Sequence, residues 1–178
     1  MLIINIETKY HDYDPDHDKT TKANQIGNRV LKQNRIMAVI QTSRDINTKI
    51  DNLWDTISDV DKDPDYWHGI KSVKNIKKEG NIIERETIIS FKESKCKEIV
   101  TLSPKYQTTT EIVEGPLVGW KTITVDKIDE NNTRINVKWD IHLKGVLWPF
   151  TFIVKKHILK GTEEALNRVT HKAIEKQK

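Results

Sequence analysis

The chain has 178 residues, of which 36% are hydrophobic and 31% charged, a length that suits one domain or one domain with an extension. No apolar run approaches the roughly 20 residues of a membrane-spanning helix, and the first ten residues lack the basic and apolar regions of a signal peptide, so we expect a cytoplasmic protein. The single cysteine, Cys96, excludes an internal disulfide and a cysteine-built zinc site.

The net charge of +4 is concentrated near the C-terminus, where residues 149–178 carry seven basic and three acidic side chains. A nucleic-acid-binding protein is expected to be basic over a wider surface. Lysines also outnumber arginines 24 to 6, although arginine is better suited to bidentate recognition of phosphates and bases. We therefore expect no nucleic-acid partner.

Residues 1–35 differ in character from the rest of the chain. A short apolar run is followed by the polar stretch HDYDPDHDKTT, and residues 21–34 show only a loose helical spacing of apolar side chains. We interpret residues 1–35 as an N-terminal extension of uncertain order and residues 36–178 as the domain itself.

The domain is predicted to begin with a strand from Ile36 and two short helices. The first helix follows from one apolar stripe at helical spacing, formed by Ile50, Leu53, Trp54 and Ile57. The second helix lies around DPDYW, with Pro64 in its first turn and Asp63 as a candidate cap.

Strands dominate the next part of the chain. Turn-forming Gly, Pro, Asn and Ser residues separate the segments, and such short connections predict antiparallel hairpins. In TRINVKWDIHL the apolar residues alternate, so Trp139 and Ile141 are expected on the buried face. The predicted strands are 71–78, 82–92, 95–102, 106–114, 118–128 and 133–144.

The apolar period changes after Pro149. Phe150, Val154 and Ile158 begin a series at three- and four-residue steps that predicts one long helix over about 149–175, loosened, kinked or closely packed at Gly161. The element order predicts an α+β fold: a curved antiparallel sheet of about seven strands around the long C-terminal helix. We expect a ligand cavity between sheet and helix, walled by Trp139, Ile141, Phe150, Val154 and Ile158.

Three segments resemble those of one protein superfamily. KIDNLWDTISDVDKDPDYW is similar to its tryptophan-bearing helical segment, and EGPLVGW at 114–120 is similar to a turn of its coenzyme-Q-binding branch. NNTRINVKWDI is similar to a hairpin that usually carries Asp-Gly, where this chain has Asn131-Asn132. With the long closing helix, residues 37–173 resemble the polyketide cyclase/dehydrase and lipid-transport superfamily, which has the helix-grip fold of START-like and birch-pollen-allergen-like proteins.

The resemblance implies that residues 36–178 form a helix-grip ligand-binding domain. It also implies, together with their positions at the ends of elements, that Tyr66, Trp67 and Trp120 lie nearer the mouth of the cavity. It supplies no catalytic residues, because members of the superfamily share no catalytic set. The chain lacks a glycine-rich phosphate loop, and we expect no cofactor.

Arg85 interrupts a strand rich in isoleucine and threonine. We favour an outward, solvated orientation. If it faces inward, Arg85 needs an anionic partner or a ligand carboxylate, because an unpaired buried charge is costly. It is therefore retained as a candidate ligand-binding residue.

Other chemistry-bearing residues give weaker signals. The alternating aspartates at 12–18 and 59–65 do not follow the EF-hand pattern, so we interpret them as solvated or capping residues and expect no metal site. The histidines match no catalytic triad motif. Cys96 lies between Lys95 and Lys97, whose charges can activate a thiol, but we interpret it as an ordinary strand residue.

Three functions remain open. The leading hypothesis is the binding or transport of a hydrophobic or amphipathic small molecule, such as a lipid, quinone or polyketide-like compound. The second is a cyclase or dehydratase acting on a polyketide- or isoprenoid-like substrate, and the third is a chaperone-like protein-interaction module. The basic C-terminal helix also suggests transient contact with an anionic membrane surface.

Overall fold

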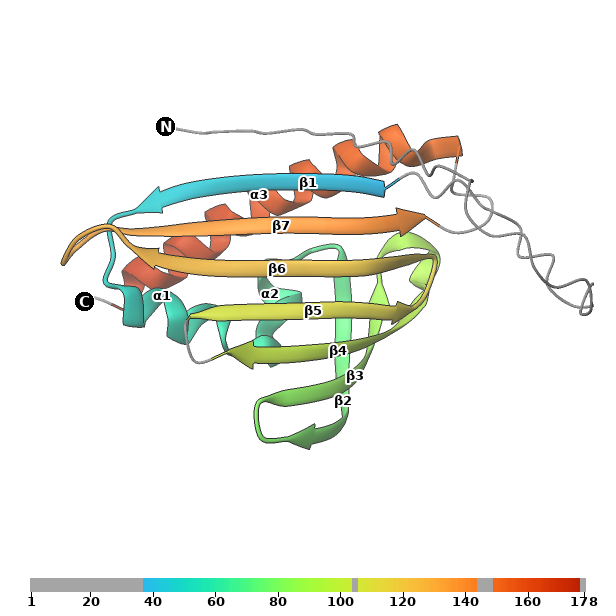
Figure 1. The fold of residues 1–178 in the computed structure, drawn as a ribbon, viewed down its shortest axis with the longest axis horizontal. Helices are drawn as coiled ribbons and strands as arrows, with labels where there is room; N and C mark the ends of the chain where they lie inside the picture. Colours follow the sequence, from blue (N-terminus) through green and yellow to red (C-terminus); the bar gives the residue numbers. More distant parts are fainter. Residues whose placement is uncertain (1–36, 104–105, 144–148, 177–178) are drawn as a thin grey trace, which may run out of the picture.

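The structure is a computed structural model that describes residues 37–103, 106–143 and 149–176. Within these residues seven strands form one antiparallel sheet in the order β1-β7-β6-β5-β4-β3-β2, so β1 and β2 are its two edges (Figure 1). The strands are β1 (Met37–Ile46), β2 (Ile70–Glu79), β3 (Ile82–Ile89), β4 (Lys95–Ser103), β5 (Gln107–Glu114), β6 (Leu117–Lys127) and β7 (Thr133–Leu143).

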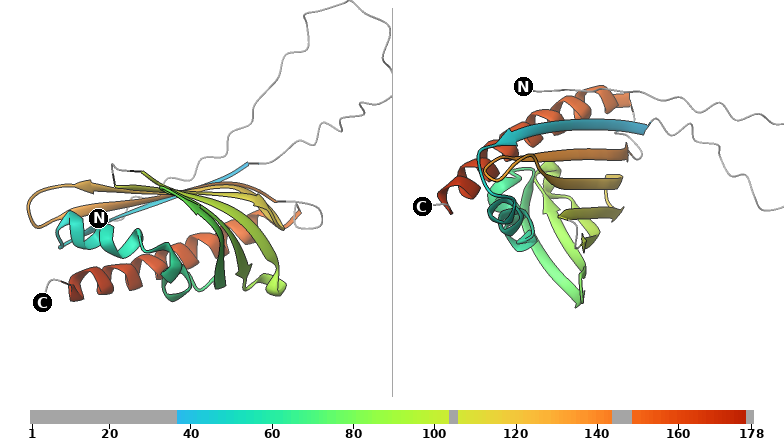
Figure 2. Two further views of the ribbon diagram at one scale, coloured as in Figure 1. Left: turned by 90° about the horizontal axis from the view of Figure 1, so that it is seen from below. Right: turned by 60° about the vertical axis from the view of Figure 1, so that its left-hand side comes forward.

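Three α-helices lie on one side of this sheet. The short helices α1 (Ile50–Ile57) and α2 (Asp63–Tyr66) connect β1 to β2, and the long helix α3 (Thr151–Glu175) follows β7. Figure 2 shows the sheet curving over α3, and all three of the helices in the described residues lie on this one side of it. The α+β class, the element order and the long closing helix are therefore as the sequence predicts.

The extension assigned to residues 1–35 lies outside the described residues, as do the aspartates at 12–18. The two-unit organisation of the chain therefore stays a prediction.

The hydrophobic core fills the space between one half of the sheet and the helices. Leu53 and Ile57 of α1 meet the inward side chains of β6 and β7, including Val125 and Ile135. The helix α3 contributes its later residues to this cluster: Ala165, Leu166, Val169 and Ala173. Each large apolar side chain buried in this way stabilises the fold by about 1.5–3 kcal/mol.

The two halves of α3 differ in how closely they pack. The buried residues of α3 all follow Gly161, beginning with Thr162. Before Gly161, Val154 and Ile158 are only half-buried, and Phe152 is exposed. The C-terminal half of the helix therefore belongs to the core, whereas the N-terminal half runs past the edge strand β1 and is packed less closely (Figure 1).

Gly161 does not interrupt the helix. The chain is helical from Thr151 to Glu175, and an added Cβ at Gly161 would meet no atom within 4 Å. Of the three alternatives expected at Gly161, close packing is therefore wrong, and the helix continues through this residue without a break.

Asp63 differs from its predicted role. It was expected as a helix cap, but it is the first residue of α2, and Lys62 precedes the helix without a side-chain cap. Pro64 does lie in the first turn, as predicted. The Asp63 carboxylate is buried and turned towards the sheet, where it contributes to the site described next.

Candidate functional site

The inner face of the sheet, the face that α3 covers, brings several predicted site residues together. Trp139 and Ile141 lie in β7 at positions whose side chains point to the inner face. The Trp139 indole donates from Nε1 to Thr162 Oγ1 at 3.1 Å, which ties the strand to the middle of α3. Trp67 lies edge-to-face against Trp139, with ring centroids 6.2 Å apart.

Tyr66 and Trp67 are buried in the hydrophobic core cluster, which contrasts with the rim position that was expected. Burial is the main cause that raises the pKa of the Tyr66 phenol above its usual value. The backbone carbonyl of Tyr66 accepts a hydrogen bond of 2.7 Å from Arg168 Nε, so the end of α2 is fastened to α3.

Trp120 and Phe150 do not join this group. Trp120 has the outward phase of β6 and is 45% exposed, on the face opposite α3. Phe150 precedes α3 and is 52% exposed. The residues of α3 named as cavity walls, Val154 and Ile158, are half-buried.

Arg85 faces inward, so the favoured outward orientation is wrong. Its guanidinium donates from Nε to Glu98 Oε2 at 2.8 Å, from one terminal nitrogen to Asp63 Oδ2 at 2.6 Å and from the other to the carbonyl oxygen of Val60 at 2.9 Å. Arg85 and Glu98 are direct cross-strand partners in β3 and β4. The anionic partners that an inward arginine requires are therefore supplied by the protein.

Lys121 was not identified from the sequence. It lies in β6 directly opposite Trp139, with its side chain only 4% exposed. The ammonium nitrogen Nζ is 4.3 Å from the ring centroid of Trp67 and 5.6 Å from that of Trp139, and 3.9 Å from Asp63 Oδ2. We call Asp63, Arg85, Glu98 and Lys121, with Trp67 and Trp139, the buried polar cluster.

Local geometry explains how the buried polar cluster forms. Asp63 and Trp67 are four residues apart around the short helix α2, so both side chains project from the same side of it. Arg85 and Lys121 occupy inward positions of their strands. Thr87, two residues after Arg85, donates to Glu98 Oε2 at 2.8 Å and holds that carboxylate in place.

The electrostatics of the cluster separate its two cations. Burial would lower the pKa of Arg85, but the charges of Asp63 and Glu98 outweigh burial and raise it above its usual value. At Lys121 burial is the largest effect and lowers the pKa; Arg85 adds to the lowering, while Asp63 and Glu98 oppose it. The arginine is therefore a fixed charge, whereas burial makes the charged form of the lysine less favourable than it is in water.

Comparison with known proteins identifies the architecture. The chain matches no family model, and no curated protein matches it by sequence. Solved structures do match: the Zhui aromatase/cyclase from Streptomyces sp. R1128 superposes with a TM-score of 0.70 at 12% identity, over 80% of this chain and 96% of that one. Norcoclaurine synthase from Thalictrum flavum gives 0.64 at 19% identity, over 89% and 99%.

A START superfamily protein from Mycobacterium smegmatis gives a TM-score of 0.56 at 14% identity, over 78% of this chain and 95% of that one. The chain has the START-like helix-grip fold. The fold by itself does not determine whether such a protein carries a ligand or catalyses a reaction.

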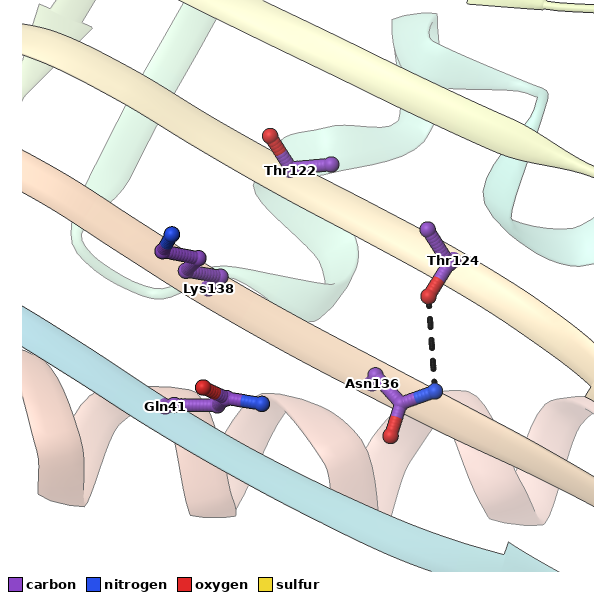
Figure 3. Close-up of a pocket in the computed structure, with 5 residues that line it drawn as sticks. All are labelled: Gln41, Thr122, Thr124, Asn136 and Lys138. Atoms are coloured by element: carbon purple, nitrogen blue, oxygen red, sulfur yellow. Dashed lines mark hydrogen bonds between the residues drawn. The ribbon is translucent and has the colours of Figure 1, made fainter. Parts of the chain in front are cut away.

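A pocket of this helix-grip structure lies on the face of the sheet away from α3. It has a volume of about 510 Å³. Figure 3 shows that its lining side chains rise from three neighbouring strands, with Asn136 donating to Thr124 Oγ1 at 3.3 Å. The lining residues are Gln41, Thr122, Thr124, Asn136 and Lys138. These side chains are polar, which makes this pocket poorly suited to a hydrophobic ligand.

The remaining candidates are accounted for by local contacts. Asp59 pairs with Lys62 and Asp61 accepts from Asn75, and the described part of the chain holds no cluster of three or more potential metal ligands. Cys96 is buried, and burial followed by the charge of Glu98 raises its pKa to about 11. It is therefore a protonated thiol at neutral pH, as an ordinary strand residue would be.

None of the helices in the described residues is both long enough and apolar enough to cross a bilayer.

Proposed function

We propose that the protein binds or transports a hydrophobic or amphipathic small molecule of the lipid, quinone or polyketide type, between the sheet and the N-terminal half of α3. The observation that carries this proposal is the contrast between the two halves of α3. The later half is buried in the core, whereas Val154 and Ile158 of the earlier half stay half-buried. A ligand that covers these apolar side chains gains about 25 cal/mol per Å² removed from water.

The buried polar cluster adds orientation to this proposal. Apolar ligand sites combine a hydrophobic lining with a few polar groups that fix the direction of the ligand. Lys121, Trp67 and Trp139 meet next to the middle of α3, where Trp139 donates to Thr162. A ligand lying along the earlier half of α3 would therefore have its polar end at Lys121.

Native mass spectrometry of the purified full chain tests the proposal. We expect a peak at the mass of the chain plus a co-purified organic molecule, which is released on collisional activation. If the protein carries nothing and also takes up no added phospholipid or quinone, the proposal is overturned.

A cyclase or dehydratase is the second candidate function, and one observation favours it. General acid–base chemistry needs at least two polar groups within reach of each other in a desolvated site, and Lys121 Nζ lies 3.9 Å from Asp63 Oδ2 with both side chains buried. The structural likeness to an aromatase/cyclase and to norcoclaurine synthase agrees with this candidate. Turnover of a polyketide-like substrate that is lost in Lys121→Met would favour the enzyme over the carrier.

We also propose that the start of α3 makes transient contact with an anionic membrane surface, with the protein located in the cytoplasm. Phe152 is 73% exposed and Ile153 52% exposed, and Val154 separates them from Lys155 and Lys156 in the sequence. Exposed apolar side chains followed by lysines suit the headgroup region of an anionic bilayer. Contact at this point would bring the proposed ligand region next to a source of apolar molecules.

A further inference from the structure

The face of the sheet away from α3, which we call the outer face, carries a polar pocket that the proposed function does not use. The pocket has a volume of about 510 Å³ and lies over β1, β7 and β6 (Figure 3). Lys138 is the direct cross-strand partner of both Gln41 and Thr122, and Asn136 is the partner of Thr124. The amide, hydroxyl and ammonium groups that line the pocket therefore come from adjacent positions of three neighbouring strands.

An aromatic ring lies beside this pocket. Trp120 precedes Thr122 by two residues, Asp140 follows Lys138 by two, and Trp120 and Asp140 are direct cross-strand partners. Alternate residues of a strand share one face and are about 7 Å apart, so these two residues form the next row of the outer face. Trp120 is 45% exposed and offers a flat apolar surface at the border of a polar site.

Polar atoms next to the pocket have unused hydrogen-bonding capacity. Asp140 Oδ1 and His142 Nδ1 are buried and have no hydrogen-bond partner among the described residues. Asn136 donates from Nδ2 to Thr124 Oγ1 at 3.3 Å and to Asp126 Oδ2 at 2.7 Å, which orients its amide and leaves its carbonyl oxygen as an acceptor. Because unsatisfied polar atoms cost free energy, a ligand rich in hydroxyl groups would be favoured here.

The charges around the pocket favour an uncharged ligand. Lys138 contributes a positive charge, but Asp140 lies two residues further along the same face. Glu111 of β5 is the partner of Trp120 on its other side, and the Asp126 carboxylate lies beside Asn136. A phosphate or sulfate group in this region would therefore meet carboxylates as well as the lysine.

We propose that the outer face of β1, β7 and β6 binds an uncharged saccharide. The C–H face of a sugar ring packs against the Trp120 indole, and its hydroxyl groups form hydrogen bonds with Gln41 and Asn136. Trp120 lies opposite Asp140, so a turn of this exposed indole towards the sugar gives a further hydroxyl access to the Asp140 carboxylate. The site lies on the other side of the sheet from the proposed ligand region at α3, so the two proposals are independent.

A nuclear magnetic resonance titration of the ¹⁵N-labelled full chain tests the proposal. The probes are three neutral trisaccharides: maltotriose, cellotriose and triacetylchitotriose. We expect at least one of them to shift the indole N–H signal of Trp120 and the side-chain amide signals of Gln41 and Asn136. The signals of the unaltered protein locate the site even if a variant folds poorly.

The matched variants are Trp120→Ala and Phe91→Ala. Phe91 lies in the turn between β3 and β4 and is 44% exposed, close to the 45% of Trp120. Trp120→Ala should weaken sugar binding at least tenfold, whereas Phe91→Ala should leave it unchanged. Asp140→Asn keeps the shape of the side chain but removes its charge, and should weaken binding several-fold.

Four outcomes would overturn the proposal. The first is that none of the three sugars shifts these signals, and the second is that Trp120→Ala binds as well as the unaltered protein. The third is that the shifts are confined to the indoles of Trp67 and Trp139, which would place the sugar on the inner face. The fourth is that inorganic phosphate shifts the outer-face signals at lower concentration than any of the sugars, which would indicate an anion site.

Discussion

Arg85 shows how a single side chain can organise a buried site. Its guanidinium joins β3, β4 and the segment containing α2 through Glu98, Asp63 and the Val60 carbonyl. Replacing it would leave two carboxylates buried without their cation. Because unpaired buried charges are costly, such a change is far more harmful than the loss of a surface ion pair.

We therefore expect Arg85→Leu to lower the free energy of unfolding by about 3–5 kcal/mol. Arg134→Leu is the matched control, since Arg134 also donates from two nitrogens to one carboxylate, that of Asp45, but does so at the surface. The control should cost at most about 1 kcal/mol. Urea unfolding of both variants measures the difference, and equal losses would show that burial does not strengthen the Arg85 pairs.

Two glycines make a second comparison at the residue scale. Gly119 has a φ of +132°, and an added Cβ would fall onto the carbonyl oxygen of Asp140 and lie 2.8 Å from Ile141 Cα. At Gly161 in α3, an added Cβ would meet no atom within 4 Å.

Gly119→Ala should destabilise the protein by about 1–3 kcal/mol or more, because backbone atoms of β7 would have to move. Gly161→Ala should stabilise it by about 0.5–1 kcal/mol, because alanine favours the helix. Thermal unfolding measures both changes. A stabilising Gly119→Ala would mean that β6 and β7 are not so close at this point.

At the scale of elements, the C-terminal half of α3 belongs to the core, and the N-terminal half belongs to the proposed ligand region. Val154 lies in the N-terminal half and is half-buried. Val154→Trp should fill the space between helix and sheet and reduce the uptake of a fluorescent lipid probe at least several-fold. Overpacking itself costs about 1–3 kcal/mol, so thermal unfolding has to show first that the variant is folded.

The control for this prediction is His157→Trp, which adds the same side chain at an exposed position of the same helix. It should leave probe binding unchanged. Undiminished binding in a folded Val154→Trp protein would place the ligand elsewhere.

The elements themselves could be predicted because their signals are local. Turn residues such as Gly80 and Gly115, both with positive φ, mark the hairpins. The alternation of apolar and polar residues in β7 predicted that Trp139 faces inward. The change of the apolar period after Pro149 predicted the helix α3. None of these signals depends on contacts between distant parts of the chain.

The buried polar cluster could not be assembled in the same way. Asp63, Arg85 and Glu98 come from three separate elements, and no short-range pattern says which carboxylate meets which cation. The sequence did hold a partial signal that Lys121 faces inward. It alternates with Ile123 and Val125 along β6, so its side chain lies on the same face of the strand as theirs. The same alternation puts Trp120 on the outer face, whereas its aromatic character had suggested a place at the cavity mouth.

At the scale of the whole molecule, the exposed start of α3 gives the protein one end that is both apolar and basic. We expect the protein to sediment with vesicles containing phosphatidylglycerol and to remain in solution with phosphatidylcholine vesicles alone. Phe152→Ser should weaken this binding because it removes the most exposed apolar ring of the described residues.

Raising the salt concentration should also weaken the binding, because ions screen lysines from anionic headgroups. Ile76→Ser is the control, since Ile76 is an exposed apolar residue on β2, far along the chain from α3. Equal binding to both kinds of vesicle would refute the membrane contact.

The edge strand β2 has a consequence for how copies of this protein behave together. An edge strand offers unpaired backbone groups to which another chain can add. In β2 the side chains are mostly exposed, they include Lys71, Lys74, Lys77 and Lys78, and the pairing with β3 is interrupted by two register shifts. Repulsion between these lysines and the local bends oppose the alignment of a second β2 strand. The β2 edge should therefore resist sheet extension between molecules, even at the high concentrations that favour aggregation.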